Sequence, residues 1–228
     1  MSESQPASER TRVRRSAARG VYDRDAIDRI LDGSLLCHVG IIDDGRPFVI
    51  PTLHVRHDDR LFIHGSTQSR LMRIAGSGAP VCVTVTLLDG IVLARSVFHH
   101  SMNYRSVLIL ANGSAVTGDA EKLLILERLV EHVLPGRWND ARRPSQKELK
   151  ATSVVGFPLD ECSAKVRQGP PQDDEADYGL PHWAGVVPLR IVPAGPMPDP
   201  RLRHGIEPPA YLKRFMQATV PASGGLPG

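Results

Sequence analysis

One seven-residue segment has the residue types of a phosphate-binding site. It runs from His64 to Arg70 and reads His-Gly-Ser-Thr-Gln-Ser-Arg, between an apolar run and the start of a helical pattern. Its hydroxyl side chains belong to Ser66, Thr67 and Ser69. The first N–H groups of a helix suit a phosphate, and an arginine adds charged, bidentate hydrogen bonds. The segment predicts a phosphate site, although a hydroxyl that only caps the helix, beside a solvated Arg70, explains the same spacing.

A second segment, residues 96–107, concentrates polar side chains between two apolar runs. Phe98, Met102 and Tyr104 are unusual in a loop that faces only water. A concave wall that mixes aromatic rings with hydrogen-bond donors suits a planar, partly polar ligand, and an exposed hairpin loop is the alternative. The adjacent His99 and His100 point to opposite faces of an extended chain, so at most one of them lines a given pocket.

A third feature is the proline at position 51, inside the apolar run of residues 48–53. Proline removes a hydrogen-bond donor from a strand and marks an edge or a bulge. The simple interpretation is an edge strand. The functional one is that the interrupted ladder leaves backbone groups near Pro51 free to meet a ligand.

Several other kinds of site have no support in the sequence. No dinucleotide-binding glycine motif follows a strand, and the Walker A, HExxH and GxSxG motifs are missing. His54 and His57 are three apart on an extended segment, which places them on opposite faces and argues against a metal. The three cysteines are far apart and form no CxxC motif. We therefore expect no metal and no disulfide, and reduced thiols in a cytoplasmic protein.

The hydrophobic pattern predicts a mainly β protein with inserted helices. The expected strands are residues 35–42, 46–55, 60–64, 80–92, 104–116, 152–159, 162–168 and 183–192, with 152–159 and 162–168 forming a hairpin. The expected helical segments are residues 22–33, 68–75, 119–134, one turn from 145, and 211–216. In residues 119–134 the apolar stripe is Leu123, Leu126, Val130 and Val133. Because helices do not alternate strictly with strands, a closed, mostly antiparallel barrel is favoured over a doubly wound sheet.

Charge and composition divide the 228 residues into three parts. Residues 1–20 hold five arginines and two glutamates, which accounts for the whole net charge of +3. The remainder is neutral, which offers no basic face for nucleic acid, and no apolar run is long enough to cross a membrane. We expect a disordered basic tail over residues 1–20, a domain over 21–193 and a proline-rich extension over 194–228.

The motifs, in order and spacing, resemble the pyridoxamine 5′-phosphate oxidase-like flavin-nucleotide-binding proteins. The matching segments are residues 49–52, 61–70, 99–107, 163–171 and 183–189. The most similar branch includes the 5-nitroimidazole resistance proteins. The resemblance covers the chain from about Tyr22 to Leu189, and implies an FMN-binding split β-barrel that works as a homodimer with one FMN at each end of the interface.

The resemblance also assigns roles by position. Ser69 and Arg70, beside Ser66 and Thr67, match the phosphate-binding start of a helix. Ile50, Pro51 and Thr52 match the strand whose backbone lies along the flavin ring. Arg105 and Ser106 match strands that reach the cofactor, often from the partner subunit. His64 matches a position beside the flavin, and His64 or His100 is a candidate proton donor.

Trp183 is expected to cover the flavin from the partner chain, and burial in the core of its own subunit is the alternative. The end of the chain departs from the vitamin oxidases, because residues 201–204 imitate their phosphate-holding motif only loosely. We therefore expect an FMN-dependent oxidoreductase that acts on a small heterocyclic or nitro compound. The alternatives are a flavin carrier without turnover and a related barrel that binds haem through a histidine.

Overall fold

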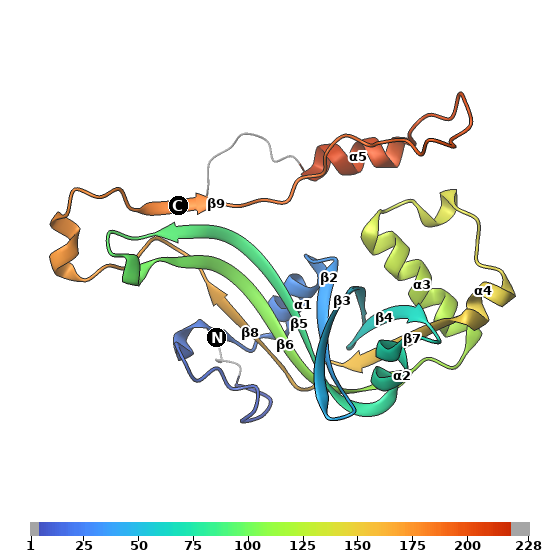
Figure 1. The fold of residues 1–228 in the computed structure, drawn as a ribbon, viewed down its shortest axis with the longest axis horizontal. Helices are drawn as coiled ribbons and strands as arrows, with labels where there is room; N and C mark the ends of the chain where they lie inside the picture. The colour runs from blue at the N-terminus through green and yellow to red at the C-terminus, as the bar shows by residue number, and fades with distance from the viewer. Residues whose placement is uncertain (1–4, 220–228) are drawn as a thin grey trace.

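The fold is built on an antiparallel sheet that closes partly on itself (Figure 1). The computed structural model describes residues 5–219. The strands in this part are β1 (Gly20–Val21), β2 (Leu36–Asp43), β3 (Arg46–His57), β4 (Arg60–Ser66), β5 (Ser77–Leu93), β6 (Ser101–Ala115), β7 (Thr152–Pro158), β8 (Cys162–Arg167) and β9 (Gly185–Pro188). Their order is β1-β8-β6-β7-β4-β3-β2-β5-β9, and an additional pairing of β5 with β6 closes a ring. The prediction of a mainly β, barrel-like fold is confirmed.

The helices interrupt the strand order without alternating with it. They are α1 (Arg24–Asp32), α2 (Arg70–Ala75), α3 (Asp119–Val133), α4 (Gln146–Ala151) and α5 (Ala210–Thr219). Two predicted starts are confirmed. Asp23 accepts a hydrogen bond of 2.9 Å from the Ala26 N–H at the start of α1, and Ser145 and Glu148 form a capping box at α4. No helix in the described residues is long and apolar enough to cross a membrane.

The core lies inside the ring of strands and under α1, with a smaller cluster under α3. The predicted face of α3 is only partly right. Leu126 and Val133 pack against this cluster, but Leu123 is 37% exposed, and the buried members from α3 are Ile125 and Leu129, which lie against β3, β4 and β7. The cause is the consecutive apolar run from Leu123 to Leu126, which is compatible with several stripes. Packing against the sheet selects one of them.

The predicted hairpin of residues 152–168 is also wrong, although both strands exist. β7 pairs with β4 and with the end of β6, and β8 pairs with β1 and the earlier part of β6. Gly156 lies opposite Ser114 and Cys162 opposite Ile109, so the two strands follow one another along the same edge of β6. The link between them contains no glycine to reverse the chain, and it continues in the same direction.

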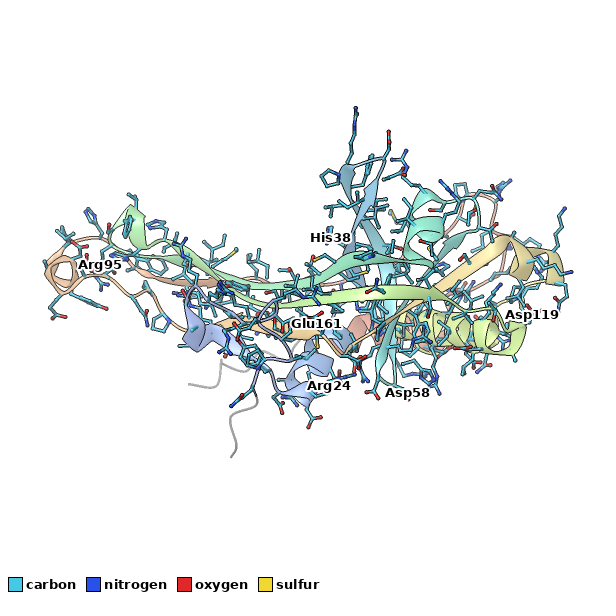
Figure 2. All side chains as sticks on the ribbon, turned by 90° about the horizontal axis from the view of Figure 1, so that it is seen from below. Arg24, His38, Asp58, Arg95, Asp119 and Glu161 are labelled. Carbon is cyan, nitrogen blue, oxygen red and sulfur yellow. The ribbon has the colours of Figure 1, made fainter. Side chains whose placement is uncertain are left out.

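Strands β5 and β6 extend beyond the barrel as a long arm (Figure 1). Its tip is the turn η2 (Val97–His99), and β9 pairs with β5 near this end. The Asp173 carboxylate accepts hydrogen bonds from the Arg95 and Ser96 N–H groups and pairs with the Arg95 guanidinium at 3.1 Å. Figure 2 shows Arg95 at the end of the arm and Asp119 at the opposite end of the molecule. The strand expected over residues 183–192 is shorter than predicted, because β9 covers only Gly185–Pro188.

The N-terminal segment lies against the sheet, which differs from the expectation of a disordered tail. Thr11 is buried, and Arg10 pairs with Glu161 at 2.6 Å. The Val13 N–H donates to the Tyr22 hydroxyl at 2.9 Å, and β1 pairs with β8. The ion pair with Glu161 and the pairing of β1 with β8 join residues that are far apart in sequence, and no local pattern in the tail reveals them. Residues 1–4 lie outside the described part.

Candidate functional site

The site begins at an open edge of β3. This strand pairs with β2 along residues 46–53, but with β4 only from His54 to His57. The second edge of residues 46–53 therefore has no strand partner in the described part of the chain. Pro51 fits such an edge because it has no N–H to offer a neighbour. The backbone groups along this edge are available to a ligand.

The start of α2 lies next to this edge. Ser69 stands at the N-cap position, but its hydroxyl makes no capping hydrogen bond. Ser66 accepts from the Gln68 N–H at 3.2 Å, and the Thr67 N–H donates to the Ala151 carbonyl at 3.0 Å. Within the described residues, the Ser69 hydroxyl thus makes no capping hydrogen bond at the point where α2 begins.

Arg70 joins α2 to β3. Its guanidinium lies 4.4 Å from the ring centre of Phe48 on β3, and 3.1 Å from the Asp43 carboxylate at the end of β2. Its side chain is 48% exposed, as the alternative of a solvated surface residue predicts, but the guanidinium has these two partners. The structure brings Arg70 beside the strand that carries Ile50, Pro51 and Thr52, and Asp43 offsets its charge.

His64 lies on β4 opposite Val154, just before the same loop. Its Nδ1 atom is buried and has no hydrogen-bond partner in the described residues. Burial lowers the pKa of His64 because it disfavours the charged ring. The imidazole is therefore neutral at pH 7, with one nitrogen free to accept a proton or to bind a ligand.

Arg105 and Ser106 lie elsewhere in the same chain. They are neighbours on β6 and face opposite sides of the sheet. Arg105 donates to both oxygens of Asp89 on β5, at 2.9 and 2.6 Å, and Ser106 donates to the Lys165 carbonyl at 3.3 Å. No hydrogen bond or ion pair joins either residue to the His64–Arg70 loop within the described part. One chain alone does not unite the predicted site.

His100 and Trp183 lie on the arm. The His100 Nδ1 is 3.0 Å from the Ser96 carbonyl oxygen, at the tip that points away from the barrel (Figure 1). Trp183 is 68% exposed, so burial in the core of its own subunit is wrong. Its indole lies over Gly185, where a Cβ would come within 2.9 Å of the ring.

Sequence reasoning missed His38, which lies on the outer face of the sheet. Alternate residues of β2 are exposed, and the strand partners of His38 are Pro51 and Thr84. The exposed apolar neighbours on β2 and β3 are Leu36, Ile42, Val49 and Leu53. His38 makes no side-chain hydrogen bond or ion pair among the described residues, and Figure 2 labels its position on the sheet. Strand alternation predicts that His38 is exposed, but only the pairing with β3 places it among apolar side chains.

The comparisons with known proteins give a family and several similar structures. The model of the family described as pyridoxamine 5′-phosphate oxidase matches residues 23–166. No curated protein matches the chain. The structure of the flavocytochrome Anf3 from Azotobacter vinelandii is 40% identical, with a TM-score of 0.88, and the match covers 93% of this chain and 99% of that one.

A second structure, of the FAD and haem binding protein from Mycobacterium smegmatis, is 34% identical with a TM-score of 0.83. That match covers 87% of this chain and 97% of the other. A candidate 5-nitroimidazole antibiotic resistance protein from Bacteroides thetaiotaomicron is 24% identical over 64% of this chain and 86% of its own, with a TM-score of 0.54. This third likeness concerns the fold alone.

Proposed function

The chain belongs to the pyridoxamine 5′-phosphate oxidase family, and we propose that it is a redox protein that binds both a flavin and a haem. The observation that carries this proposal is the extent of the similarity. The structure named as a flavocytochrome matches 93% of the chain, and the one named as an FAD and haem binding protein matches 87%. The family model ends at residue 166, so these matches include more of the molecule than the shared barrel.

The flavin site that fits best lies between the open edge of β3 and the start of α2. The FMN part, alone or as half of FAD, would lie along Ile50, Pro51 and Thr52. Its phosphate would meet the hydroxyl groups of Ser66, Thr67 and Ser69 and the guanidinium of Arg70. The free Ser69 hydroxyl and the open β3 edge support this placement, since both offer hydrogen-bonding groups that the protein does not use itself.

His38 is the residue that fits a haem. A histidine that would hold a haem iron needs an imidazole nitrogen without another partner, and the porphyrin would need an apolar surface. His38 meets both requirements, with Ile42 58% and Val49 68% exposed nearby. When bound, the flavin exchanges electrons singly or in pairs and the haem iron exchanges them singly.

The same geometry supports a homodimer as part of this proposal. Arg105, Ser106 and Trp183 lie apart from the His64–Arg70 loop in one chain, so a shared flavin site needs them from a second copy. The arm supports this, because Phe98 is 85% exposed at its tip and large exposed apolar patches mark interaction surfaces. Sedimentation over a dilution series, with and without flavin, tests it. We expect a dimer, and a monomer that keeps full flavin affinity would contradict a shared site.

Within this site His64 would accept and donate protons beside the flavin. Its ring is neutral at pH 7 because burial lowers its pKa, so Nδ1 can accept a proton close to the flavin position. The positive charge of Arg105 would be partly offset, because its guanidinium donates hydrogen bonds to both carboxylate oxygens of Asp89. Turnover with a reduced nicotinamide dinucleotide and a nitro or heterocyclic acceptor would identify a small-molecule oxidoreductase rather than a flavin carrier.

The first experiment is spectroscopic. We expect the purified protein to show flavin absorbance and a Soret band, and the released flavin to be identified by mass spectrometry. His38→Ala should abolish the Soret band and leave the flavin content unchanged, because it removes only the imidazole that would hold the haem iron. His204→Ala, an exposed histidine in the C-terminal segment, is the matched control. Protein without bound flavin, or a Soret band unchanged in the His38 variant, would contradict the proposal.

A further inference from the structure

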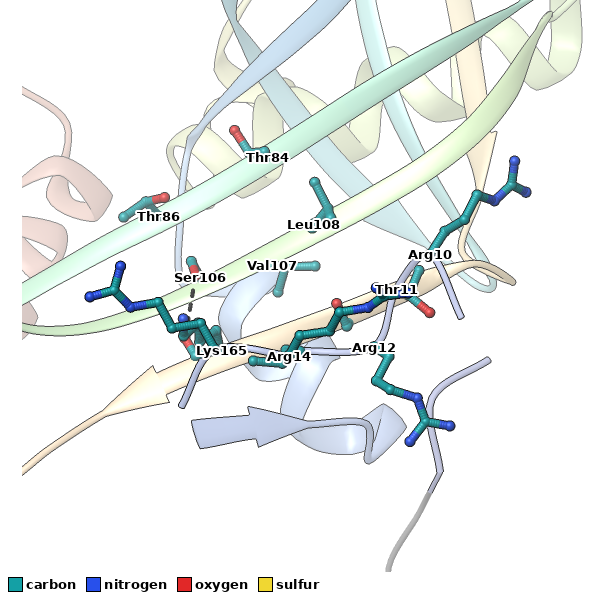
Figure 3. A pocket seen from close by; sticks show the side chains of 13 residues that line it. Arg10, Thr11, Arg12, Arg14, Thr84, Thr86, Ser106, Val107, Leu108 and Lys165 are labelled. Atoms are coloured by element: carbon teal, nitrogen blue, oxygen red, sulfur yellow. Dashed lines mark hydrogen bonds between the residues drawn. The ribbon is translucent and has the colours of Figure 1, made fainter. Parts of the chain in front are cut away.

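A second ligand pocket, which we call the tail pocket, lies between the N-terminal segment and the outer face of the sheet (Figure 3). None of its lining residues belongs to the segment His64–Arg70, which we call the α2 loop. Its volume is about 410 Å³, within the range of about 300–1,000 Å³ that is typical of small-molecule sites. Residues 10–15 form one wall. The sheet contributes Thr84, Thr86, Ser106, Leu108, Ser163 and Lys165.

Strand register builds the floor of this pocket. Thr84 of β5 lies opposite Leu108 of β6, which lies opposite Ser163 of β8. One step along, Thr86 lies opposite Ser106, which lies opposite Lys165. Directly opposite residues point to the same side of a sheet, so the floor consists of two parallel rows that carry hydroxyl groups and one ammonium group.

The N-terminal wall is held by specific contacts. Arg10 donates two hydrogen bonds to Glu161, at 3.1 and 2.6 Å, and the buried Thr11 donates to the Ser8 carbonyl at 3.1 Å. The Val13 N–H donates to the Tyr22 hydroxyl at 2.9 Å. These contacts fix the backbone beside the sheet.

The lining has an excess of positive charge. It contains no aspartate or glutamate. Arg10 is paired with Glu161 and Arg12 with Glu9, but Arg14, Arg15 and Lys165 have no carboxylate partner among the described residues. Three uncompensated cations around a hydroxyl-rich floor suit a ligand that carries at least two negative charges.

We propose that this pocket binds the phosphate groups of a nucleoside diphosphate. Guanidinium and hydroxyl donors are the groups that recognise phosphate, and the volume exceeds what a single phosphate needs. Half-buried Val13 and Leu108 supply apolar contact for a base or sugar. Two sources share this chemistry: the adenosine diphosphate half of a bound FAD, and a free dinucleotide that donates electrons. Only the first source rests on the proposed function.

ADP is the probe, titrated calorimetrically into the full chain after bound flavin has been removed, because an FAD that occupied the pocket would exclude it. Arg14→Gln with Lys165→Gln should weaken ADP binding at least tenfold, because each change removes a charged hydrogen bond. Thr86→Val, which keeps the charge and shape, should weaken it a few-fold. Arg128→Gln on α3, an exposed arginine away from the pocket, is the control and should leave ADP affinity unchanged.

The flavin content distinguishes the two sources. If the pocket holds half of FAD, the Arg14 and Lys165 variant should retain FMN in place of FAD by mass spectrometry. If it holds a free dinucleotide, flavin content should stay constant while ADP and the dinucleotide lose affinity together. Equal ADP affinity in wild type, the Arg14 and Lys165 variant and Thr86→Val would overturn the proposal. If the purified protein contains no flavin but its ADP binding depends on Arg14, the pocket proposal is supported and the proposed function is contradicted.

Discussion

The molecule has two regions suited to phosphate, and they are built in opposite ways. The α2 loop gathers its groups within seven consecutive residues, and its arginine is already paired with Asp43. The tail pocket gathers its groups from the N-terminal segment and from three strands, and three of its cations have no carboxylate partner among the described residues. A local motif therefore reveals where a site begins, whereas the charge available to a ligand depends on neighbours that are distant in sequence.

The difference has a consequence for binding. At the α2 loop, a phosphate must share Arg70 with Asp43 and gains its remaining hydrogen bonds from hydroxyl and backbone groups. In the tail pocket, attraction between unlike charges dominates. Exposed charge attraction is screened by salt, so ADP binding should fall more steeply with ionic strength than flavin binding does.

Arg70→Ala gives the largest expected effect that separates the two regions. It should weaken flavin binding by about 1.5–3 kcal/mol, the usual size for a charged hydrogen bond, and leave ADP affinity unchanged. Arg73→Ala is the control, because it is an exposed arginine on the same helix. Flavin fluorescence in titrations of the apoprotein is the measurement. Equal flavin affinity in the two variants would remove Arg70 from the site.

The accuracy of the sequence-based prediction follows the same division. Asp23, Ser145 and the strand segments were predictable because caps and alternation are local signals. The strand partners of β7 and β8 were not predictable. The two strands occupy consecutive stretches of one edge of β6, and no turn residue between them indicates this arrangement. The floor of the tail pocket depends on the register of β5, β6 and β8, and that register leaves no trace in the spacing of Thr86, Ser106 and Lys165.

A pH change should affect the barrel through one buried histidine, which is not part of the tail pocket. Burial lowers the pKa of His54 from 6.5 to about 4. Above pH 6.5 the ring is neutral in both states and contributes nothing to the pH dependence. As the pH falls below 6.5, only the unfolded chain takes up the proton readily, so the folded state loses stability.

At pH 5 this loss should amount to about 2 kcal/mol. Urea unfolding of wild type and His54→Gln at pH 7 and pH 5 measures it, since the glutamine does not titrate and its amide can still donate to the Leu31 carbonyl that lies 3.1 Å from the His54 ring. His204→Gln is the exposed control. The idea fails if wild type and His54→Gln lose the same stability between the two pH values.

The smallest expected effect concerns Asp43. Its carboxylate and the Arg70 guanidinium are both partly exposed, and such pairs are worth about 0.2–1 kcal/mol. Asp43→Asn should therefore release Arg70 to a phosphate and strengthen flavin binding by roughly two- to fivefold. Asp44→Asn is the matched control: it removes the same charge next door, at a backbone φ of 49° that asparagine tolerates. Flavin titration of both variants gives the result. If Asp43→Asn instead weakens flavin binding relative to Asp44→Asn, Asp43 orients Arg70 toward the ligand and does not compete with the ligand. The α2 loop would then depend on a carboxylate, whereas the tail pocket has none in its lining.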